Sequence, residues 1–221
     1  MPDRFRRLHL LVEGQTEEAV VIEVLRPHLE HAGWAVTFSI ITTRRPARGP
    51  AHRGGLATWG KLQREIRLLL RDSSIGILTT LVDFYGLPED CPGMADRPAH
   101  GAYERVAHVE AAMAREIDDR RFLPNVVLHE FEAWVFAAGA QLADLRGDPS
   151  LAARLAEEVA RAGAPELINE GPATAPSKRL MAVCPDYAKT VEGPLAVAAL
   201  GVEALRARCP HVHDWLLALD A

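Results

Sequence analysis

The sequence has few cysteines, no long apolar run and no excess of positive charge. Its three cysteines, Cys91, Cys184 and Cys209, are widely spaced and form no CxxC pair, which argues against a disulfide framework and a structural zinc site. The apolar runs are far too short to span a bilayer, and no signal-type apolar segment follows the first arginines. These absences predict a cytoplasmic protein with reduced thiols and no membrane partner.

The charge balance limits how this chain could bind nucleic acid. A formal net charge of −5 means that the protein as a whole is no polycation. It would therefore have to bind nucleic acid through a local basic patch, a bound metal or another subunit. One such patch is the proline- and glycine-bearing loop at 44–55, which carries Arg44, Arg45, Arg48 and Arg53.

Apolar segments that suit buried strands alternate with helical patterns along the chain. The expected strands are 6–13, 34–43, 75–83 and 122–128, and the expected helices are 17–32, 58–71 and 102–118. The remainder, from about residue 138, is rich in alanine and leucine and predicts short helices. This order predicts an α/β fold with a mainly parallel sheet flanked by helices and a helical C-terminal part. We expect an α/β domain over 1–137 and a helical extension over 138–221.

Acidic residues follow three of the expected strands. Glu13 comes after the first strand, Asp83 ends the third, and Glu130 and Glu132 follow the fourth. The carboxyl ends of parallel strands share one edge, where open α/β sheets bind their ligands. Gathered carboxylates favour Mg²⁺ or Mn²⁺, and such an ion would polarise a phosphoryl oxygen.

Each of these acids also has a plainer interpretation. Glu13 and Asp83 could cap turns. Glu130 and Glu132 are two residues apart and point in different directions, so one of them is structural, although the spacing does not tell which. His129 either orients a carboxylate or is a satisfied polar group.

A fourth motif lies at 176–179, where a proline starts a helix and two cations follow. Lys178 near a helix N-terminus opposes the helix dipole, so its position calls for another benefit. Binding of a phosphate or carboxylate would supply one; the alternative is a solvated surface pair of Lys178 and Arg179.

Four motifs in order, VEGQTE at 12–17, DFYG at 83–86, HEFEAW at 129–134 and PSKR at 176–179, resemble a small Toprim-like family of unknown function, numbered 4276. That group is related to the Toprim nucleases of the overcoming-lysogenization-defect type. The resemblance implies a catalytic Glu13, Asp83 as the first acid of an Asp-x-Asp motif, and a further metal-binding acid in HEFEAW. Ser177 and Lys178 resemble the late polar and lysine positions of the nuclease branch. One departure is Tyr85, which stands in place of the second acid.

Together these features predict a metal-dependent phosphodiesterase, a nuclease acting on DNA or RNA. Glu13, Asp83 and one of Glu130 and Glu132 would hold Mg²⁺ or Mn²⁺, with Glu13 also serving as general base or acid. Lys178 would neutralise charge on the phosphoryl group. Backbone phosphates would be gripped by Arg44, Arg45, Arg48, Arg53, Ser177 and Arg179.

The resemblance also implies a setting, since members of the family accompany ATPases with an ABC or AAA-type core in bacterial antiviral neighbourhoods. A homodimer is compatible with the sequence. Two alternatives stay open: a non-catalytic Toprim-like adaptor that binds an ATPase or nucleic acid, and a small-molecule phosphohydrolase or nucleotidyl transferase. Tyr85 in place of an acid favours the adaptor, and the retained acids argue against it.

Overall fold

The computed structural model describes residues 6–41, 58–169 and 174–220. The chain divides into two compact units. Unit 1 comprises Met1–Gly14 and Gly33–Val126, and unit 2 comprises Gln15–Ala32 and Val127–Ala221. Each unit is a part of the chain whose residues contact one another more than they contact the other part. The expected division into domains at residue 137 stays a prediction.

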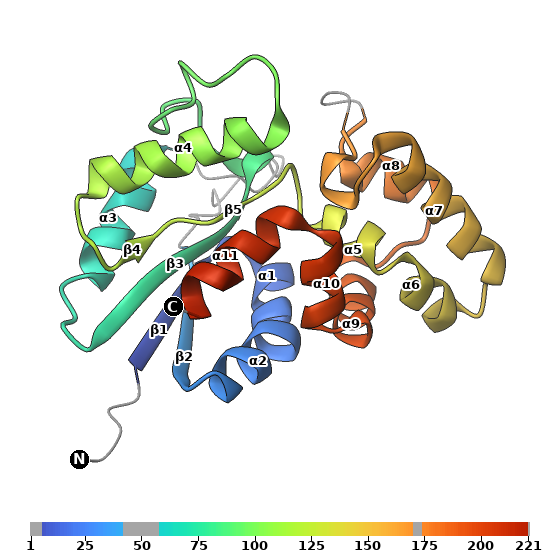
Figure 1. The fold of residues 1–221 in the computed structure, drawn as a ribbon, viewed down its shortest axis with the longest axis horizontal. Helices are drawn as coiled ribbons and strands as arrows, with labels where there is room; N and C mark the ends of the chain where they lie inside the picture. Colours follow the sequence, from blue (N-terminus) through green and yellow to red (C-terminus); the bar gives the residue numbers. More distant parts are fainter. Residues whose placement is uncertain (1–5, 42–57, 170–173, 221) are drawn as a thin grey trace, which may run out of the picture. The chain divides into compact units, whose positions relative to one another are not determined.

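Unit 1 is built on a parallel sheet with the strand order β2-β1-β3-β4, and β5 also pairs with β3 (Figure 1). The strands are β1 (Arg6–Val12), β2 (Trp34–Ile40), β3 (Ile75–Asp83), β4 (Phe122–Leu123) and β5 (Val126–Val127). β1 lies in the middle, and each of its residues from Leu8 to Val12 is buried. An apolar strand that pairs on both sides suits this central place. The expected α/β class with a mainly parallel sheet is confirmed.

The strand order reverses direction between β1 and β3. From β1 the chain crosses to β2 on one side, and it then returns to form β3 on the other side of β1. Val12 is in register with Ile40 of β2 and with Leu81 of β3. The carboxyl ends of β1 and β3 therefore flank the topological switch point, which is where open α/β sheets place their ligands.

The expected fourth strand, 122–128, is broken into β4 and β5. Pro124 lies at the break and has no N–H to donate to a sheet ladder. At the next residue, the Thr80 hydroxyl donates to the Asn125 carbonyl and accepts from the Asn125 N–H. A side chain on β3 thus replaces the backbone pairing that Pro124 interrupts.

Two helices of unit 1 accompany the sheet, α3 (Trp59–Leu69) and α4 (Ala102–Ile117) (Figure 1). Leu62 and Ile66 of α3 are fully buried. The two helices are joined at Glu116, whose carboxylate accepts from Gln63 and whose carbonyl accepts from Arg67. Between β3 and α4 the chain makes one 3₁₀ turn, η2 (Phe84–Gly86).

The described residues of unit 2 are almost entirely helical. From residue 127 onward the helices are α5 (Glu132–Ala137), α6 (Gly139–Arg146), α7 (Pro149–Ala162), α8 (Pro176–Val183), α9 (Lys189–Leu200), α10 (Val202–Arg208) and α11 (Pro210–Asp220), with a 3₁₀ turn η3 (Pro165–Leu167). The helical C-terminal part is therefore confirmed.

The first helical segment of the chain also belongs to unit 2 and is interrupted. α1 (Gln15–Val20) and α2 (Arg26–His31) are separated by a π-helical turn, η1 (Val21–Leu25). The Arg26 N–H donates to the Val21 carbonyl, five residues earlier, immediately before Pro27. Proline cannot continue the regular α-helical ladder, which accounts for the wider turn. The sequence predicted one helix over 17–32; the helix instead starts at Gln15.

The three cysteines are buried and free. Burial raises the pKa of the Cys91 thiol to about 12, so this thiol stays protonated at neutral pH. Among the described helices, none combines the length and the apolar character needed to cross a bilayer.

Candidate active site

Two carboxylates lie at the switch point of the sheet in unit 1. Glu13 is the first residue after β1, and its N–H donates to the Leu81 carbonyl at 3.2 Å. The Asp83 N–H, at the end of β3, donates to Oε2 of Glu13 at 3.3 Å. The Glu13 carboxylate therefore reaches across to the neighbouring strand, where Asp83 begins the DFYG motif. Both residues are partly exposed.

Gly86 makes room for the Glu13 carboxylate. A Cβ atom on Gly86 would lie 2.6 Å from Oε2 and 3.0 Å from Oε1 of Glu13, which is closer than real Cβ atoms come. The η2 turn can pass so close to the carboxylate only because residue 86 has no side chain. Gly86 therefore helps to fix the position of Glu13, a role that the sequence analysis did not foresee.

The donor set at this edge suits a hard divalent ion. Mg²⁺ usually binds one or two protein carboxylates and completes its six oxygens with waters and substrate phosphates. Glu13 and Asp83 supply two such carboxylates. Tyr85, at the position of the missing second acid, is 38% exposed. Within the described ranges, no group of three or more His, Cys, Asp or Glu side chains is placed to enclose a metal ion.

In unit 2 the HEFEAW motif forms the turn from β5 into α5. His129 is a buried residue with a φ of 63°, in the left-handed region that few residues other than glycine adopt. Its Nδ1 lies 3.4 Å from the side-chain amide nitrogen of Asn169. Such backbone strain persists where the surroundings hold it, and it is common at functional sites.

Glu132, in the first turn of α5, is almost completely buried and is paired with a lysine. It is 1% exposed, and Nζ of Lys189 lies 3.1 Å from each of its carboxylate oxygens. Burial raises the pKa of Glu132, and the positive charge of Lys189 opposes this shift. Lys189 is a candidate functional residue that the sequence analysis missed. The signal used for Lys178, a cation at a helix start, was also present there.

Glu130 contacts the other predicted motif of this unit. Its Oε2 accepts a hydrogen bond from the Ser177 N–H at 2.8 Å, at the start of α8. The carboxylate thereby satisfies one of the open N–H groups of the helix. Lys178 is exposed on the same turn.

The sequence-predicted residues thus fall into two groups. Unit 1 brings Glu13 and Asp83 together, and unit 2 joins Glu130 to Ser177 and Glu132 to Lys189. The assignment of Glu130 or Glu132 as a metal ligand stays a prediction, as does the role of Lys178. Arg44, Arg45, Arg48 and Arg53 lie outside the described residues.

An open parallel sheet with two carboxylates at its switch point defines the chain as an α/β protein with an acidic site. The chain belongs to the family described as a domain of unknown function, DUF4276, which matches residues 12–220. The expected family membership is confirmed. The comparison with curated proteins gives no match. Among solved structures, the chain is similar to the C-terminal region of the Burkholderia pseudomallei OLD protein, with a TM-score of 0.47 and 16% identity over 98% of this chain and 100% of that chain.

Proposed function

We propose that this protein is a metal-dependent phosphodiesterase that cleaves DNA or RNA. The observation that carries the proposal is the position of Glu13 and Asp83 at the ends of two adjacent parallel strands, with the Asp83 N–H on the Glu13 carboxylate and Gly86 making room for it. A carboxylate pair at a switch point is suited to a hard cation and a phosphate.

Each side chain has a distinct part in this proposal. Mg²⁺ or Mn²⁺ held by Glu13 and Asp83 would polarise a phosphoryl oxygen of the substrate. Glu13 is also the candidate general base or acid, because its carboxylate is partly exposed yet fixed by a backbone donor. Lys178, exposed on α8, is proposed to neutralise charge on the phosphoryl group, and Ser177 and Arg179 to contact the nucleic-acid backbone.

The biological setting is a proposal that rests on the resemblance of the four motifs. It includes an ABC or AAA-type ATPase as partner, a role in bacterial antiviral defence, a cytoplasmic location and a homodimer. Each of these would be tested on the whole chain, by purification with the ATPase and by measurement of the mass in solution.

Calorimetric titration with Mn²⁺ and Mg²⁺ tests the metal site directly. We expect the wild type to bind, and Glu13→Gln and Asp83→Asn to bind at least about tenfold more weakly, because each amide loses a negative charge at the ion. Cleavage of labelled single- and double-stranded DNA and RNA should fall in parallel.

Glu89→Gln is the matched control, since Glu89 is an exposed acid in the loop that follows the DFYG motif. It should leave both metal binding and cleavage unchanged. Lys178→Gln should bind metal as the wild type does, and slower cleavage by this variant would identify Lys178 as the cation that acts. Lys189→Gln leaves the buried Glu132 unpaired, so its cleavage is compared only after its thermal melt is shown to match that of the wild type. Cleavage retained by both Glu13→Gln and Asp83→Asn would refute the proposal.

A second candidate function is the non-catalytic adaptor. It is favoured by the engagement of Glu130 with Ser177 and of Glu132 with Lys189, which gives both acids structural roles. In the part of the chain that the structure describes, the remaining acids form no group of three. Absence of Mn²⁺ binding to the wild type, together with stable binding to an ATPase, would support the adaptor.

A further inference from the structure

Positive charge is concentrated in one stretch of this acidic chain. Residues 44–71 contain eight lysines and arginines but one acid, whereas the chain as a whole has a net charge of −5. The first four of these cations lie outside the described residues. The other four lie on α3 or in the turn that ends it: Lys61, Arg64, Arg67 and Arg71. The structure therefore shows how half of this positive charge is presented.

Three of these cations form a row on the solvent side of α3. Lys61, Arg64 and Leu68 follow one another at intervals of three and four residues, which places them on one face, opposite the buried residues of the helix. Arg71 follows in the closing turn, and all four side chains are exposed. Arg67 lies to one side and donates to a carbonyl at the end of α4. We call Lys61, Arg64 and Arg71 the basic row, which is about 15 Å long at a rise of about 1.5 Å per residue.

The acids around α3 are engaged by other groups. Asp72 pairs with Arg7 at 2.7 Å, Asp90 accepts from the first N–H of the helix, and Glu116 accepts from a glutamine on the flank of α3. Glu65, the acid of the helix itself, is half-buried beside the basic row. Within the described ranges, no ion pair joins a member of the basic row to an acid. Glu65 balances one of the three charges at most, so the basic row keeps a positive surplus.

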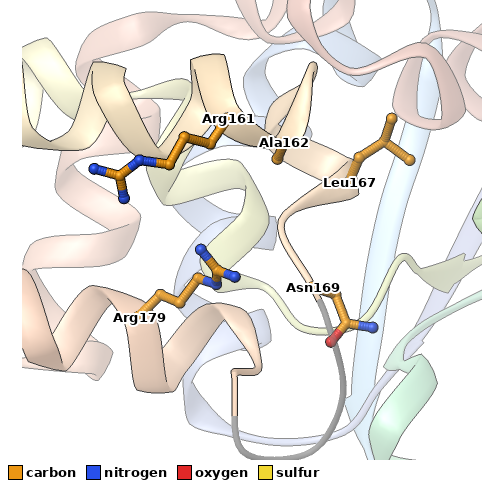
Figure 2. Close-up of a pocket in the computed structure, with 5 residues that line it drawn as sticks. All are labelled: Arg161, Ala162, Leu167, Asn169 and Arg179. Atoms are coloured by element: carbon orange, nitrogen blue, oxygen red, sulfur yellow. The ribbon is translucent and has the colours of Figure 1, made fainter.

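The arginines that line a pocket in unit 2 are arranged differently (Figure 2). Arg161 pairs with Glu157 and Glu158, and Arg179 pairs with Glu158. Two guanidinium groups thus have two carboxylates, and that pocket carries no surplus charge. The comparison shows that the unpaired cations of the basic row are a particular feature of α3.

The basic row suits a nucleic-acid duplex better than a protein or a single strand. The centre of a protein interface is depleted of charge, and this face offers one large apolar side chain, Leu68, which is 60% exposed. Single strands are held by exposed aromatic rings, and Trp59, the aromatic residue of α3, is 7% exposed. A duplex carries one negative charge per about 1.7 Å of its axis, so a row of this length spans several phosphates.

We propose that the basic row binds the backbone of double-stranded nucleic acid, with Lys61, Arg64 and Arg71 each contacting a phosphate. The contact is independent of base sequence, because backbone phosphates carry no sequence information directly. This inference rests on the proposed function, for which it names the duplex as the class of substrate. The basic row would hold the duplex on unit 1 while Glu13 and Asp83 act on a phosphodiester.

Binding of a short labelled duplex in EDTA, followed by fluorescence anisotropy over a range of salt concentrations, tests the basic row without metal or cleavage. Each phosphate contact adds about 0.9 to the steepness with which log affinity falls against log salt. We expect Lys61→Gln, Arg64→Gln and Arg71→Gln each to reduce this slope by about 1 and to weaken binding severalfold. The triple variant should reduce the slope by about 3, and the exposure of all three side chains should leave its thermal melt unchanged.

Two control variants match these changes in charge. Arg115→Gln removes one positive charge from an exposed position on α4, directly before Glu116, and should leave the slope unchanged. Leu68→Glu adds an acid within the basic row without removing a cation, and should weaken duplex binding severalfold. Leu145→Glu makes the same change at an exposed leucine of α6 and should bind as the wild type does.

The proposal is overturned by no duplex binding to the wild type at low salt, by an unchanged slope in the triple variant, or by equal losses in Leu68→Glu and Leu145→Glu. Tighter binding of a single strand than of a duplex of the same length would overturn the choice of a duplex. Cleavage is measured separately with Mn²⁺. A wild type that binds the duplex through the basic row without cleaving it would refute the nuclease and support the basic row, so the two failures remain distinguishable.

Discussion

At the scale of single residues, the position of the acids could be predicted and the fit around them could not. Glu13 and Asp83 were recognised because each follows an apolar segment that reads as a buried strand. The contact of Gly86 with Glu13 depends on how the η2 turn crosses the sheet edge, which no local pattern encodes. The ion pair of Lys189 with Glu132 could not be predicted for a related reason, since the two residues are distant in sequence.

Gly86→Ala should impair the site without unfolding the protein. The new Cβ would meet the Glu13 carboxylate, which lies at the end of a flexible side chain and can rotate away. We expect a loss of about 1 kcal/mol or less in the free energy of unfolding, and metal affinity lowered about tenfold or more because the carboxylate is displaced. Urea denaturation and calorimetry measure the two effects. Unchanged metal affinity would show that the position of Glu13 is unimportant.

His9, a buried histidine in β1, should make stability depend on pH. Its ring nitrogens lie 2.8 Å from the Thr37 hydroxyl and 2.9 Å from the Ser39 hydroxyl. Burial, with Arg7 nearby, lowers the pKa of His9 from 6.5 to about 4. Between these values the unfolded chain binds a proton that the folded chain does not, so the free energy of unfolding falls as the pH falls from 6.5 toward 4.

Urea denaturation at several pH values checks this expectation. His9→Gln keeps a side chain that can donate and accept but does not titrate. Its stability should therefore fall less steeply with decreasing pH across this window than that of the wild type. Parallel curves for the two proteins would contradict the assignment.

At the scale of the elements, two of the differences between the predicted and the observed strands and helices lie at prolines. The predicted strand 75–83 begins and ends at the same residues as β3. This apolar, threonine-rich run contains no proline that would interrupt a strand. The expected fourth strand is broken at Pro124, and the expected first helix contains the π-turn before Pro27. A periodic pattern locates an element, whereas the neighbours of a proline decide whether the element continues through it.

Gly193→Ala should separate two helices of unit 2. The added Cβ would fall on the Tyr187 hydroxyl and lie 2.9 Å from the Phe131 ring, in the contact between α9 and α5. Overfilling such a contact costs about 1–3 kcal/mol. Urea denaturation followed by circular dichroism measures the loss.

Gly60→Ala is the control, since Gly60 lies in α3 and has no atom within 4 Å of the added methyl group. It should be neutral or stabilising by up to about 1 kcal/mol. An equal effect of the two substitutions would show that Gly193 is not needed for close packing.

At the scale of the whole molecule, unit 2 is assembled from two stretches of chain. α1 and η1, near the N-terminus, pack against α9. Val20, Val21, Val24 and Leu25 are buried in these first elements. The alternation of strands and helices predicted the fold class, but this pairing joins segments that no periodicity connects.

A fragment of residues 1–137 tests the expected domain division. It retains α1 and η1 but lacks α9, so their apolar side chains would lose their cover. We expect the fragment to bind the dye ANS and to aggregate, and co-expression with residues 138–221 to restore a soluble complex. A monodisperse fragment with a cooperative melt would instead establish 1–137 as an independent domain.

The split composition of unit 2 has a consequence for synthesis. An interval passes between the emergence of residues 15–32 from the ribosome and that of α9, because the stretch at 33–188 is made in between. For most of that time the apolar face of α1 and η1 has no native partner. Nascent chains of this protein should therefore depend on chaperones more than a fold of contiguous units would, and slowing translation should increase aggregation rather than prevent it.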